Sequence, residues 1–327
     1  MALKALTAVI GLGALATGMT AQYRASQAES AFPPLGQFVE VTGGQVHYVQ
    51  EGEGPHLVLL HGAGGNLREF TFDLMGRLSD NYTVTAFDRP GLGYTDRVPD
   101  VADGWFATAG DTPLDQAIML REAAAAIGIE NPIVVGHSFG GIVGLGWASI
   151  GLDLQAPENA AAFVSFAGVA MPWPGDLGWY YTWNGSALGG AVMVPVIAAL
   201  AQPSTIEKAV NDTFRPDAPP AGYADYIGGP LTVRADSFRA NARQVNTLRP
   251  HVVEMMKRYH ELTLPIEILH GSADVIVPPS VHSDPLLELV PSARLTMLDG
   301  VGHMPHQIDP DAAVAAIDRA ATRAGLR

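Results

Sequence analysis

The chain has 327 residues, of which 48% are hydrophobic and 16% are charged, so it can bury a sizeable core and bulk disorder is excluded. Its 19 Lys and Arg stand against 33 Asp and Glu, and the net charge of −14 repels a phosphate backbone, so we expect no nucleic-acid partner. The lack of cysteine excludes disulfides, thiolate metal sites and a cysteine nucleophile.

Residues 1–36 have the pattern of a membrane anchor or signal segment followed by a linker. Residues 5–23 form a run of 19 residues without a charge, between Lys4 and Arg24. As a helix this run would be about 28 Å long, close to the ~30 Å hydrocarbon core of a bilayer. An uncleaved anchor, a signal peptide cleaved near residues 14–16, and a buried helix all fit the run. Either of the first two makes the protein membrane-anchored or exported.

The same segment contains a G-x-G-x-x-A pattern at Gly11, Gly13 and Ala16, a pattern typical of dinucleotide-binding loops. Such a loop needs a strand before it and a βαβ unit around it. This pattern instead lies at the N-terminus, ahead of a linker that contains Pro33 and Pro34. We therefore expect no dinucleotide cofactor.

After Gly36 the chain alternates between strand and helix patterns. Residues 39–42 and 45–49 are β-rich and flank Gly43 and Gly44, a pair typical of a tight hairpin turn. Residues 56–60 are a continuous apolar run, typical of a strand buried on both faces of a parallel sheet. Helical spacing over residues 67–78 then leads to a strand at 82–87.

The alternation continues toward the C-terminus. Thr112, Pro113 and Asp115 mark the start of a helix that Gly128 ends. Further strands are predicted at residues 133–135, 162–167, 266–269 and 294–298, and a last helix at about 311–323. This rhythm predicts an α/β fold, with helices on both faces of a mostly parallel, twisted sheet. The core domain is expected to comprise residues 37–171 and 263–327.

Residues 172–262 break this alternation. They contain three of the five Trp, and helical spacing returns in their C-terminal part, so we expect an inserted helical cap over the sheet edge. Aromatic side chains of the cap are candidates for substrate contacts, and core packing is the alternative. The candidates are Trp173, Trp179, Tyr180 and Trp183.

The strongest chemical signal is G-x-S-x-G at residues 136–140, centred on Ser138. It falls between a predicted strand and an apolar helical stretch, which is the context that a nucleophile elbow requires. Gly136 and Gly140 avoid collisions in the sharp turn, and the helix that follows favours an anion at its N-terminus. We therefore expect Ser138 to be a catalytic nucleophile.

A serine nucleophile needs a base, and the base needs an orienting acid. Asp274 and His303 lie in loops that follow two predicted strands, so both open on the same edge of a parallel sheet as Ser138. The chain order Ser138, Asp274, His303 is also the order found in one large class of serine hydrolases. We expect His303 to be the base and Asp274 to be the acid.

Three other residues compete for these roles. His306 is a rival base. With His303 it forms an H-x-x-H pair that could bind a metal, but no further ligand cluster accompanies the pair, so we expect no metal site. Asp284 and Asp299 are rival acids, but neither lies in the loop that follows a strand at the right point in the chain.

The oxyanion of a serine hydrolase needs two fixed donors. One is expected from the backbone N–H of Phe139, the residue after the nucleophile. The other is expected from the Gly-rich turn at residues 61–65, at Ala63. His61 is expected to orient this turn, and His137 to be a packing neighbour. The other histidines expected to pack are His47, His56 and His270.

Together these motifs resemble those of the α/β-hydrolase superfamily, in particular its capped, serine-dependent, esterase-like members. The resemblance covers about residues 36–327, through residues 61–65, 88–93 and 136–141 and the loops of Asp274 and His303. It implies the fold, the triad and the lack of a metal or organic cofactor. Relatives that open epoxides or remove halides carry Asp in place of Ser138, which argues against both reactions. Members that cleave carbon–carbon bonds commonly have Asn where this chain has His137.

The sequence thus predicts a serine hydrolase that cleaves a carboxylic ester of a small to medium apolar substrate. A serine-dependent carbon–carbon or other acyl hydrolase is the alternative within the same fold, and a catalytically silent binding protein is the alternative from another class. The complete triad and its glycines argue against the silent protein. The expected partners are a small-molecule substrate and, through an uncleaved N-terminal segment, a membrane.

Overall fold

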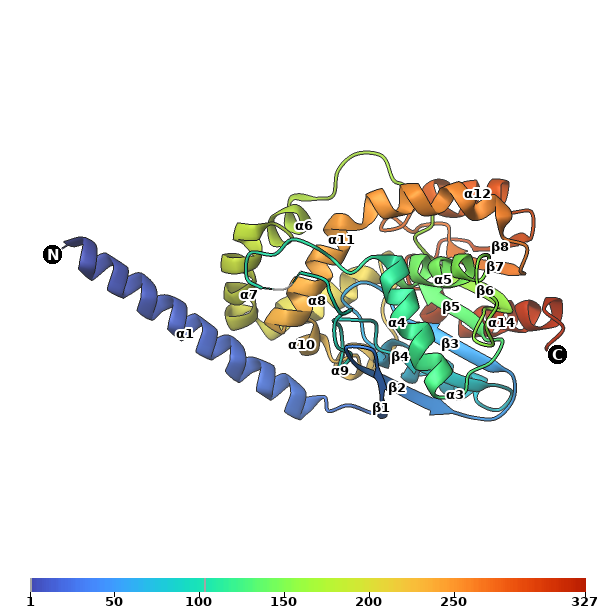
Figure 1. The fold of residues 1–327 in the computed structure, drawn as a ribbon, viewed down its shortest axis with the longest axis horizontal. Coiled ribbons are helices and arrows are strands. Elements are labelled where there is room, and N and C mark those ends of the chain that lie inside the picture. The colour runs from blue at the N-terminus through green and yellow to red at the C-terminus, as the bar shows by residue number, and fades with distance from the viewer. Residues whose placement is uncertain (1, 103) are drawn as a thin grey trace.

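The computed structural model describes residues 2–102 and 104–327, apart from the side chains of residues 2, 3, 5, 6, 8 and 10. Its centre is an eight-stranded sheet in the order β1-β2-β4-β3-β5-β6-β7-β8 (Figure 1). The pairs β1–β2 and β2–β4 are antiparallel, and the other pairs are parallel, so the expected mostly parallel α/β fold is confirmed. The strands are β1 (Gln37–Val41), β2 (Gly44–Glu51), β3 (His56–Leu60), β4 (Thr83–Phe87), β5 (Ile133–His137), β6 (Ala162–Phe166), β7 (Ile266–Gly271) and β8 (Ala293–Leu298).

The hairpin between β1 and β2 turns one residue earlier than predicted. Val41 lies opposite Gly44, so Thr42 and Gly43 form the turn and Gly44 already belongs to β2. Gly43 has φ +81°, a conformation that residues with a Cβ rarely adopt. One left-handed glycine is therefore enough for this turn.

Two hydrophobic cores lie on opposite faces of the sheet, and β3 contributes to both. Val58 and Leu60 face one core while Leu57 and Leu59 face the other, which explains the continuous apolar run of this strand. Helices on both faces complete the layers that the alternating pattern predicts. The first face is covered by α4 (Pro113–Ala126), α5 (Phe139–Ile150) and α12 (Pro279–Leu289), and the second by α3 (Leu74–Leu78) and α14 (Pro310–Arg323).

The helix boundaries follow local signals at some places and depart from them at others. Helix α4 begins with a capping box, in which the Thr112 hydroxyl accepts from the Asp115 N–H and the Asp115 carboxylate accepts from the Thr112 N–H. The single helix expected over residues 67–78 is instead split into α2 (Arg68–Thr71) and α3. The split occurs at Asp73, whose φ of −149° interrupts the helix.

A run of helices occupies residues 179–261 between β6 and β7, and we call it the helical segment (Figure 1). It touches two loops of the sheet edge, since Asn241 accepts a hydrogen bond from the Gly64 N–H at 2.7 Å and Asp217 accepts one from the Gly302 N–H at 2.8 Å. Its elements are α6 (Trp179–Asn184), η1 (Gly189–Met193), α7 (Val194–Leu200), α8 (Pro203–Thr213), α9 (Tyr223–Tyr226), α10 (Gly229–Thr232), α11 (Ala235–Met255) and η2 (Met256–Glu261).

Helix α1 (Ala2–Ala31) lies against the helical segment, and its N-terminal half extends away from the body of the molecule (Figure 1). Ala21 packs with Ala198 and Ala199, and Arg24 donates a hydrogen bond to the Ala199 carbonyl at 3.0 Å. The G-x-G-x-x-A pattern falls inside this helix. It is therefore a stretch of helix and not the strand-to-helix loop of a dinucleotide site.

Among the residues that the structure describes, no single helix is long and apolar enough to span a membrane. One bent pair, Gly189–Leu200 followed by Pro203–Thr213, reaches that length and composition across a bend of 104°. The predicted anchor at residues 5–23 falls partly outside the described residues, at the side chains of residues 5, 6, 8 and 10.

Candidate active site

Ser138 lies at a sharp turn between β5 and α5. Its backbone has φ 52° and ψ −117°, a conformation that residues with a side chain rarely hold. Glycines on both sides permit the turn. A Cβ on Gly136 would lie 2.2 Å from the Gly140 carbonyl oxygen, and a Cβ on Gly140 would lie 2.0 Å from the Leu60 carbonyl oxygen. The turn holds Ser138 at the N-terminus of α5, where the helix dipole favours a developing anion.

His303 lies between Ser138 and Asp274. Its Nε2 is 2.9 Å from Ser138 Oγ, and its Nδ1 is 2.7 Å from Asp274 Oδ2. The three residues follow β5, β7 and β8, which end at the same edge of the parallel sheet. All three are buried. The structure thus brings together the serine, the histidine and the aspartate that the sequence assigned to this edge.

Asp274 is held by hydrogen bonds on both carboxylate oxygens. Oδ1 accepts from the N–H groups of Ile276 at 2.8 Å and Val277 at 2.9 Å, while Oδ2 faces His270 Nε2 at 3.1 Å as well as His303. Burial alone would raise the pKa of Asp274, but the hydrogen bonds from His270 and His303 outweigh it and hold that pKa well below its ordinary value. Asp274 is therefore an anion that keeps the proton of His303 on Nδ1.

His303 has the charge state that a general base needs. Burial is the main cause that lowers the pKa of His303, and the neighbouring His137 lowers it further, while the hydrogen bond to Asp274 opposes both. The imidazole is consequently neutral at neutral pH. With Nδ1 donating to Asp274, Nε2 is free to accept the proton of the Ser138 hydroxyl.

The Gly-rich turn at residues 61–65 passes directly beside the nucleophile, because a Cβ on Gly62 would lie 3.1 Å from Ser138 Cβ. Three of its N–H groups are occupied: Gly65 donates to the Gly62 carbonyl at 3.3 Å, while Gly62 donates to Glu69 Oε2 at 3.3 Å and Gly64 donates to Asn241 Oδ1 at 2.7 Å. Ala63 lies between them, and within the described part of the chain its N–H makes no hydrogen bond. This leaves the Ala63 N–H available for an oxyanion.

His61 and Arg89 hold this turn in place. His61 Nε2 accepts from the Arg89 N–H at 2.9 Å, and the Arg89 side chain donates to the carbonyls of His61 at 2.8 Å and Gly62 at 3.0 Å. Burial, aided by the Arg89 charge, lowers the pKa of His61 to about 4. His61 is therefore neutral, as it must be to accept a hydrogen bond on Nε2.

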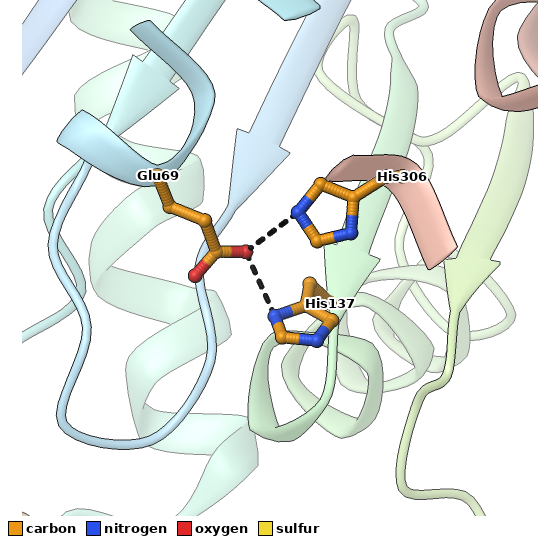
Figure 2. A group of neighbouring side chains, drawn as sticks. All are labelled: Glu69, His137 and His306. Atoms are coloured by element: carbon orange, nitrogen blue, oxygen red, sulfur yellow. Dashed lines mark ion pairs between the residues drawn. The ribbon is translucent and has the colours of Figure 1, made fainter. Parts of the chain in front are cut away.

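A second buried polar cluster lies beside the triad. Figure 2 shows one carboxylate oxygen of Glu69 facing two neighbouring histidines: Oε1 is 2.8 Å from His137 Nδ1 and 3.3 Å from His306 Nε2. The facing atoms of the three side chains all lie within 4.8 Å of one another, close enough to hold a metal ion. No local signal in the sequence indicates Glu69, whose pattern is that of a surface residue on a short helix.

None of the rival candidates takes part in the contacts of the triad. His306 faces Glu69 and stacks on Phe166, with ring centroids 5.3 Å apart. Asp299 is exposed and accepts from the Ser272 hydroxyl at 3.1 Å, and Asp284 is exposed on α12. The groups joined to Ser138 are therefore His303 and Asp274.

Three of the four aromatic residues expected at the substrate are exposed to solvent. Trp179 is 76% exposed, Trp183 is 56% exposed and Tyr180 is 41% exposed, all on α6. Trp173 is half-buried against the core on one face of the sheet. The helical segment instead reaches the site through Asn241 and Asp217, which the spacing of apolar residues could not indicate.

Comparison with known proteins finds hydrolases that are similar to this chain over most of its length. A family model described as Alpha/beta hydrolase family matches residues 57–317. A 2-hydroxymuconate semialdehyde hydrolase from Pseudomonas putida is 26% identical over 285 residues, which are 83% of this chain and 88% of that protein. An esterase from Rhodococcus sp. ECU1013 has a similar structure, with TM-score 0.65 and 23% identity, over 88% of this chain and 98% of the esterase. A bacterial membrane phospholipase A, with TM-score 0.64 and 21% identity, covers 98% of this chain and 99% of its own.

Proposed function

Because the chain belongs to the alpha/beta hydrolase family, and is thus a hydrolase, we propose that it hydrolyses a carboxylic ester through Ser138, His303 and Asp274. This proposal rests on two hydrogen bonds of the His303 ring: Nδ1 lies 2.7 Å from Asp274 Oδ2, and Nε2 lies 2.9 Å from Ser138 Oγ. Both distances lie in the range of hydrogen bonds that transfer protons. A serine paired with a neutral, acid-oriented imidazole is an activated nucleophile.

Acylation begins when His303 Nε2 accepts the proton of Ser138 as Oγ attacks the acyl carbon. Asp274 remains ionised and stabilises the imidazolium. The negative charge that develops on the carbonyl oxygen receives hydrogen bonds from the N–H groups of Ala63 and Phe139, each worth about 3 kcal/mol by analogy with known oxyanion donors. His303 then protonates the leaving alcohol as the ester C–O bond breaks, and the acyl group stays on Ser138.

Water completes the reaction along the reverse path. His303 removes a proton from a water molecule, which attacks the acyl carbon, and the same two N–H groups bind the oxyanion again. His303 returns its proton to Ser138 Oγ as the carboxylic acid leaves. Every step is carried by Ser138, His303, Asp274 and water.

We also propose that residues 172–262 act as a cap on a core domain of residues 37–171 and 263–327. The support is that Asn241 binds the oxyanion turn while Asp217 binds the His303 loop, so the segment contacts both sides of the triad. Ser138 is only 8% exposed, which implies that substrate enters past this segment. An enclosed site of this kind favours a small to medium apolar ester.

Hydrolysis of a carbon–carbon bond is the second candidate. The relative from Pseudomonas putida, a 2-hydroxymuconate semialdehyde hydrolase, favours it because the match covers 83% of this chain. His137 argues against it, since members with this activity commonly carry Asn before the nucleophile. The two reactions use the same nucleophile and differ in the bond that breaks, so substrate tests distinguish them.

We propose that α1 anchors the protein to a membrane or directs its export. Val9, Leu12, Leu15 and Met19 are each at least 60% exposed on this helix, an apolar surface that is unfavourable in water and favourable in a bilayer. Trp183 on the neighbouring helical segment is exposed as well, and Trp suits a membrane interface. Recovery of full-length protein, with Met1 intact, in the soluble cell fraction would contradict this assignment.

A panel of p-nitrophenyl esters and a ring-fission dienone, tested on wild type and Ser138→Ala, examines the proposed reaction. We expect turnover of short- and medium-chain esters, and a loss on the order of a million-fold in the variant. Turnover of the dienone in place of the esters would select the second candidate. A folded Ser138→Ala protein that kept most of its activity would contradict both.

A further inference from the structure

The buried cluster beside the triad has no role in the proposed mechanism as it stands. It comprises Glu69 on α2, His137 at the end of β5 and His306 on α13 (Pro305–Ile308) (Figure 2). At most 5% of each side chain is exposed. A buried carboxylate costs on the order of several kcal/mol unless a positive charge or full hydrogen bonding offsets it. The Glu69 carboxylate therefore needs a positively charged partner.

His137 is the group positioned to carry that charge. Its Nδ1 lies 2.8 Å from Glu69 Oε1, and its Nε2 lies 3.0 Å from the His303 carbonyl oxygen. A carboxylate and a carbonyl both accept hydrogen bonds, so each ring nitrogen needs a hydrogen, and an imidazole with two is an imidazolium. Burial alone would lower the pKa of His137, but the Glu69 carboxylate outweighs burial and raises that pKa.

His306 faces the same carboxylate oxygen through a weaker contact. Its Nε2 is 3.3 Å from Glu69 Oε1, its Nδ1 has no hydrogen-bond partner in the described part of the chain, and its ring stacks on Phe166. Burial lowers the pKa of His306 to about 4. His306 is therefore neutral near pH 7 and supplies no charge.

A metal ion is the other species that these groups could hold, since two His and one Glu are a known donor set for zinc. Tetrahedral zinc with bonds of about 2.0 Å would keep its ligand atoms about 3.3 Å apart. The 2.8 Å between His137 Nδ1 and Glu69 Oε1 is too short for that spacing and is the distance of a close ion pair. His306 Nδ1 also lacks the outer hydrogen-bond partner that metal-bound histidines have. The geometry thus fits a proton better than a metal.

The Glu69–His137 pair touches three parts of the proposed site. Glu69 Oε2 accepts from the Gly62 N–H at 3.3 Å and so holds the oxyanion turn. His137 directly precedes Ser138, and it donates to the His303 carbonyl. Its ring centre lies 4.9 Å from that of His303. One ion pair therefore joins the nucleophile turn, the oxyanion turn and the loop of the base.

We propose that Glu69 and His137 form a permanent buried ion pair that positions Ser138, His303 and the oxyanion turn. Both are positioning residues, since neither touches the reacting atoms, and their role rests on the proposed function. The fixed positive charge beside His303 also disfavours its protonation, so the base stays available at lower pH. The other ionisable groups that face the pair are His61, Arg89, Tyr223, Asp274, His303 and His306.

The charge state of His137 can be measured without substrate, by NMR of the full-length protein with ¹⁵N-labelled histidine. We expect hydrogen on both ring nitrogens of His137 throughout about pH 5.5 to 8.5, with the signals assigned by their loss in His137→Asn. One bare nitrogen on His137 in this range would overturn the proposal. So would a stoichiometric metal whose removal by a chelator changes the His137 signals.

Glu69→Gln tests the positioning role, because glutamine keeps the shape of Glu69 and one acceptor oxygen for the Gly62 N–H but removes the charge. Its amide NH2 then donates to a bare His137 Nδ1, so that His137 becomes neutral. We expect kcat to fall about tenfold with little change in KM, and the acidic limb of the kcat/KM profile to move up by about one pH unit as His303 regains a higher pKa. A folded variant with the wild-type pH profile would overturn the proposal.

Glu267→Gln is the matched control, since Glu267 is also a buried glutamate but pairs with Arg319 and Arg323 near the other end of β7. We expect Glu267→Gln to be less stable than wild type, with the acidic limb of its kcat/KM profile unchanged. An equal shift of the acidic limb in both variants would show that Glu69 has only a structural role and would overturn the proposal. The NMR result does not depend on turnover. Failure of the proposed function would instead appear as activity retained in Ser138→Ala.

Discussion

The sheet edge and the outer helices of this molecule arrange their side chains in opposite ways. At the edge, polar groups such as Ser138, Asp274 and His303 are buried and hydrogen-bonded to one another. On α1 and α6, large apolar groups such as Leu12 and Trp179 are exposed. Soluble domains usually keep apolar side chains inside and polar ones outside, so both regions depart from the rule in opposite directions.

These opposite arrangements indicate that the two regions serve different tasks. Buried polar groups are unfavourable for stability unless they are fully paired, so a paired set at a sheet edge points to chemistry. Exposed apolar groups in a large patch favour association with a surface. We therefore expect substitutions at the edge to change turnover or stability, and substitutions on the outer helices to change where the protein resides.

After Ser138→Ala, the largest effect is expected from Asp274→Asn. Asparagine cannot stabilise the imidazolium and favours the wrong tautomer of His303, so kcat should fall about ten-thousand-fold while the fold is kept. Asp299→Asn is the control, because Asp299 is exposed and its carboxylate accepts a hydrogen bond from the Ser272 hydroxyl. Ester turnover by both variants is the measurement, and comparable loss in the two would contradict the assignment of the acid.

Gly140→Ala should be the next largest change. A Cβ at this position would lie 2.0 Å from the Leu60 carbonyl oxygen, and backbone cannot yield cheaply, so we expect a loss of about 3 kcal/mol in the free energy of unfolding. Gly76→Ala on α3 is the matched control, because a Cβ there meets nothing within 4 Å and should stabilise slightly. Urea denaturation measures the free energy of unfolding of both variants. Equal values would argue against steric crowding at Gly140.

Buried histidines near the sheet edge should also make the stability of the fold depend on pH. Burial is the leading cause that lowers the pKa values of His61, His282 and His306 to about 4, against 6.5 for the free side chain. Between these values the unfolded chain binds more protons, so the free energy of unfolding should fall as pH drops from 6.5 to 4, by about 3 kcal/mol for one such group. His282→Asn should reduce this slope, whereas His260→Asn, at an exposed site, should leave it unchanged. A flat profile in wild type would contradict the prediction.

The smallest effect on chemistry is expected on the outer helices. Replacing Trp179 and Trp183 together by Ser should leave hydrolysis of a soluble ester within about twofold, since both side chains are largely exposed to solvent. Binding to lipid vesicles should weaken roughly tenfold, because two interfacial aromatic groups are lost. Leu154→Ser, another exposed apolar position, should not weaken vesicle binding. A large loss of turnover in the Trp variant would show that the two regions are not separate.

Sequence patterns predicted those parts of the molecule that depend on local spacing. The strand of Leu57 to Leu60 follows from its apolar run, and Ser138, Asp274 and His303 follow from a motif and from their positions after strands. The strand–helix alternation likewise predicts the layers, because each element must bury one face or both.

The remaining features arise only when distant elements meet. Glu69, His137 and His306 come from three separate elements, and their contact exists only in the assembled sheet. The exposure of Trp179 and Trp183 could not be predicted either, because helical spacing defines a face but does not say whether another element covers it. The break of the 67–78 helix at Asp73, where φ is −149°, is likewise not indicated by the spacing of apolar residues.

The most direct test of the central claim is labelling of full-length protein with a fluorophosphonate probe, followed by peptide mapping of wild type and Ser138→Ala. We expect one modified residue, Ser138, in the wild type and no modification in the variant, because Ser138 combines a hydrogen-bonded imidazole with an adjacent oxyanion turn. Labelling at another residue, or none in a folded wild-type protein, would contradict it.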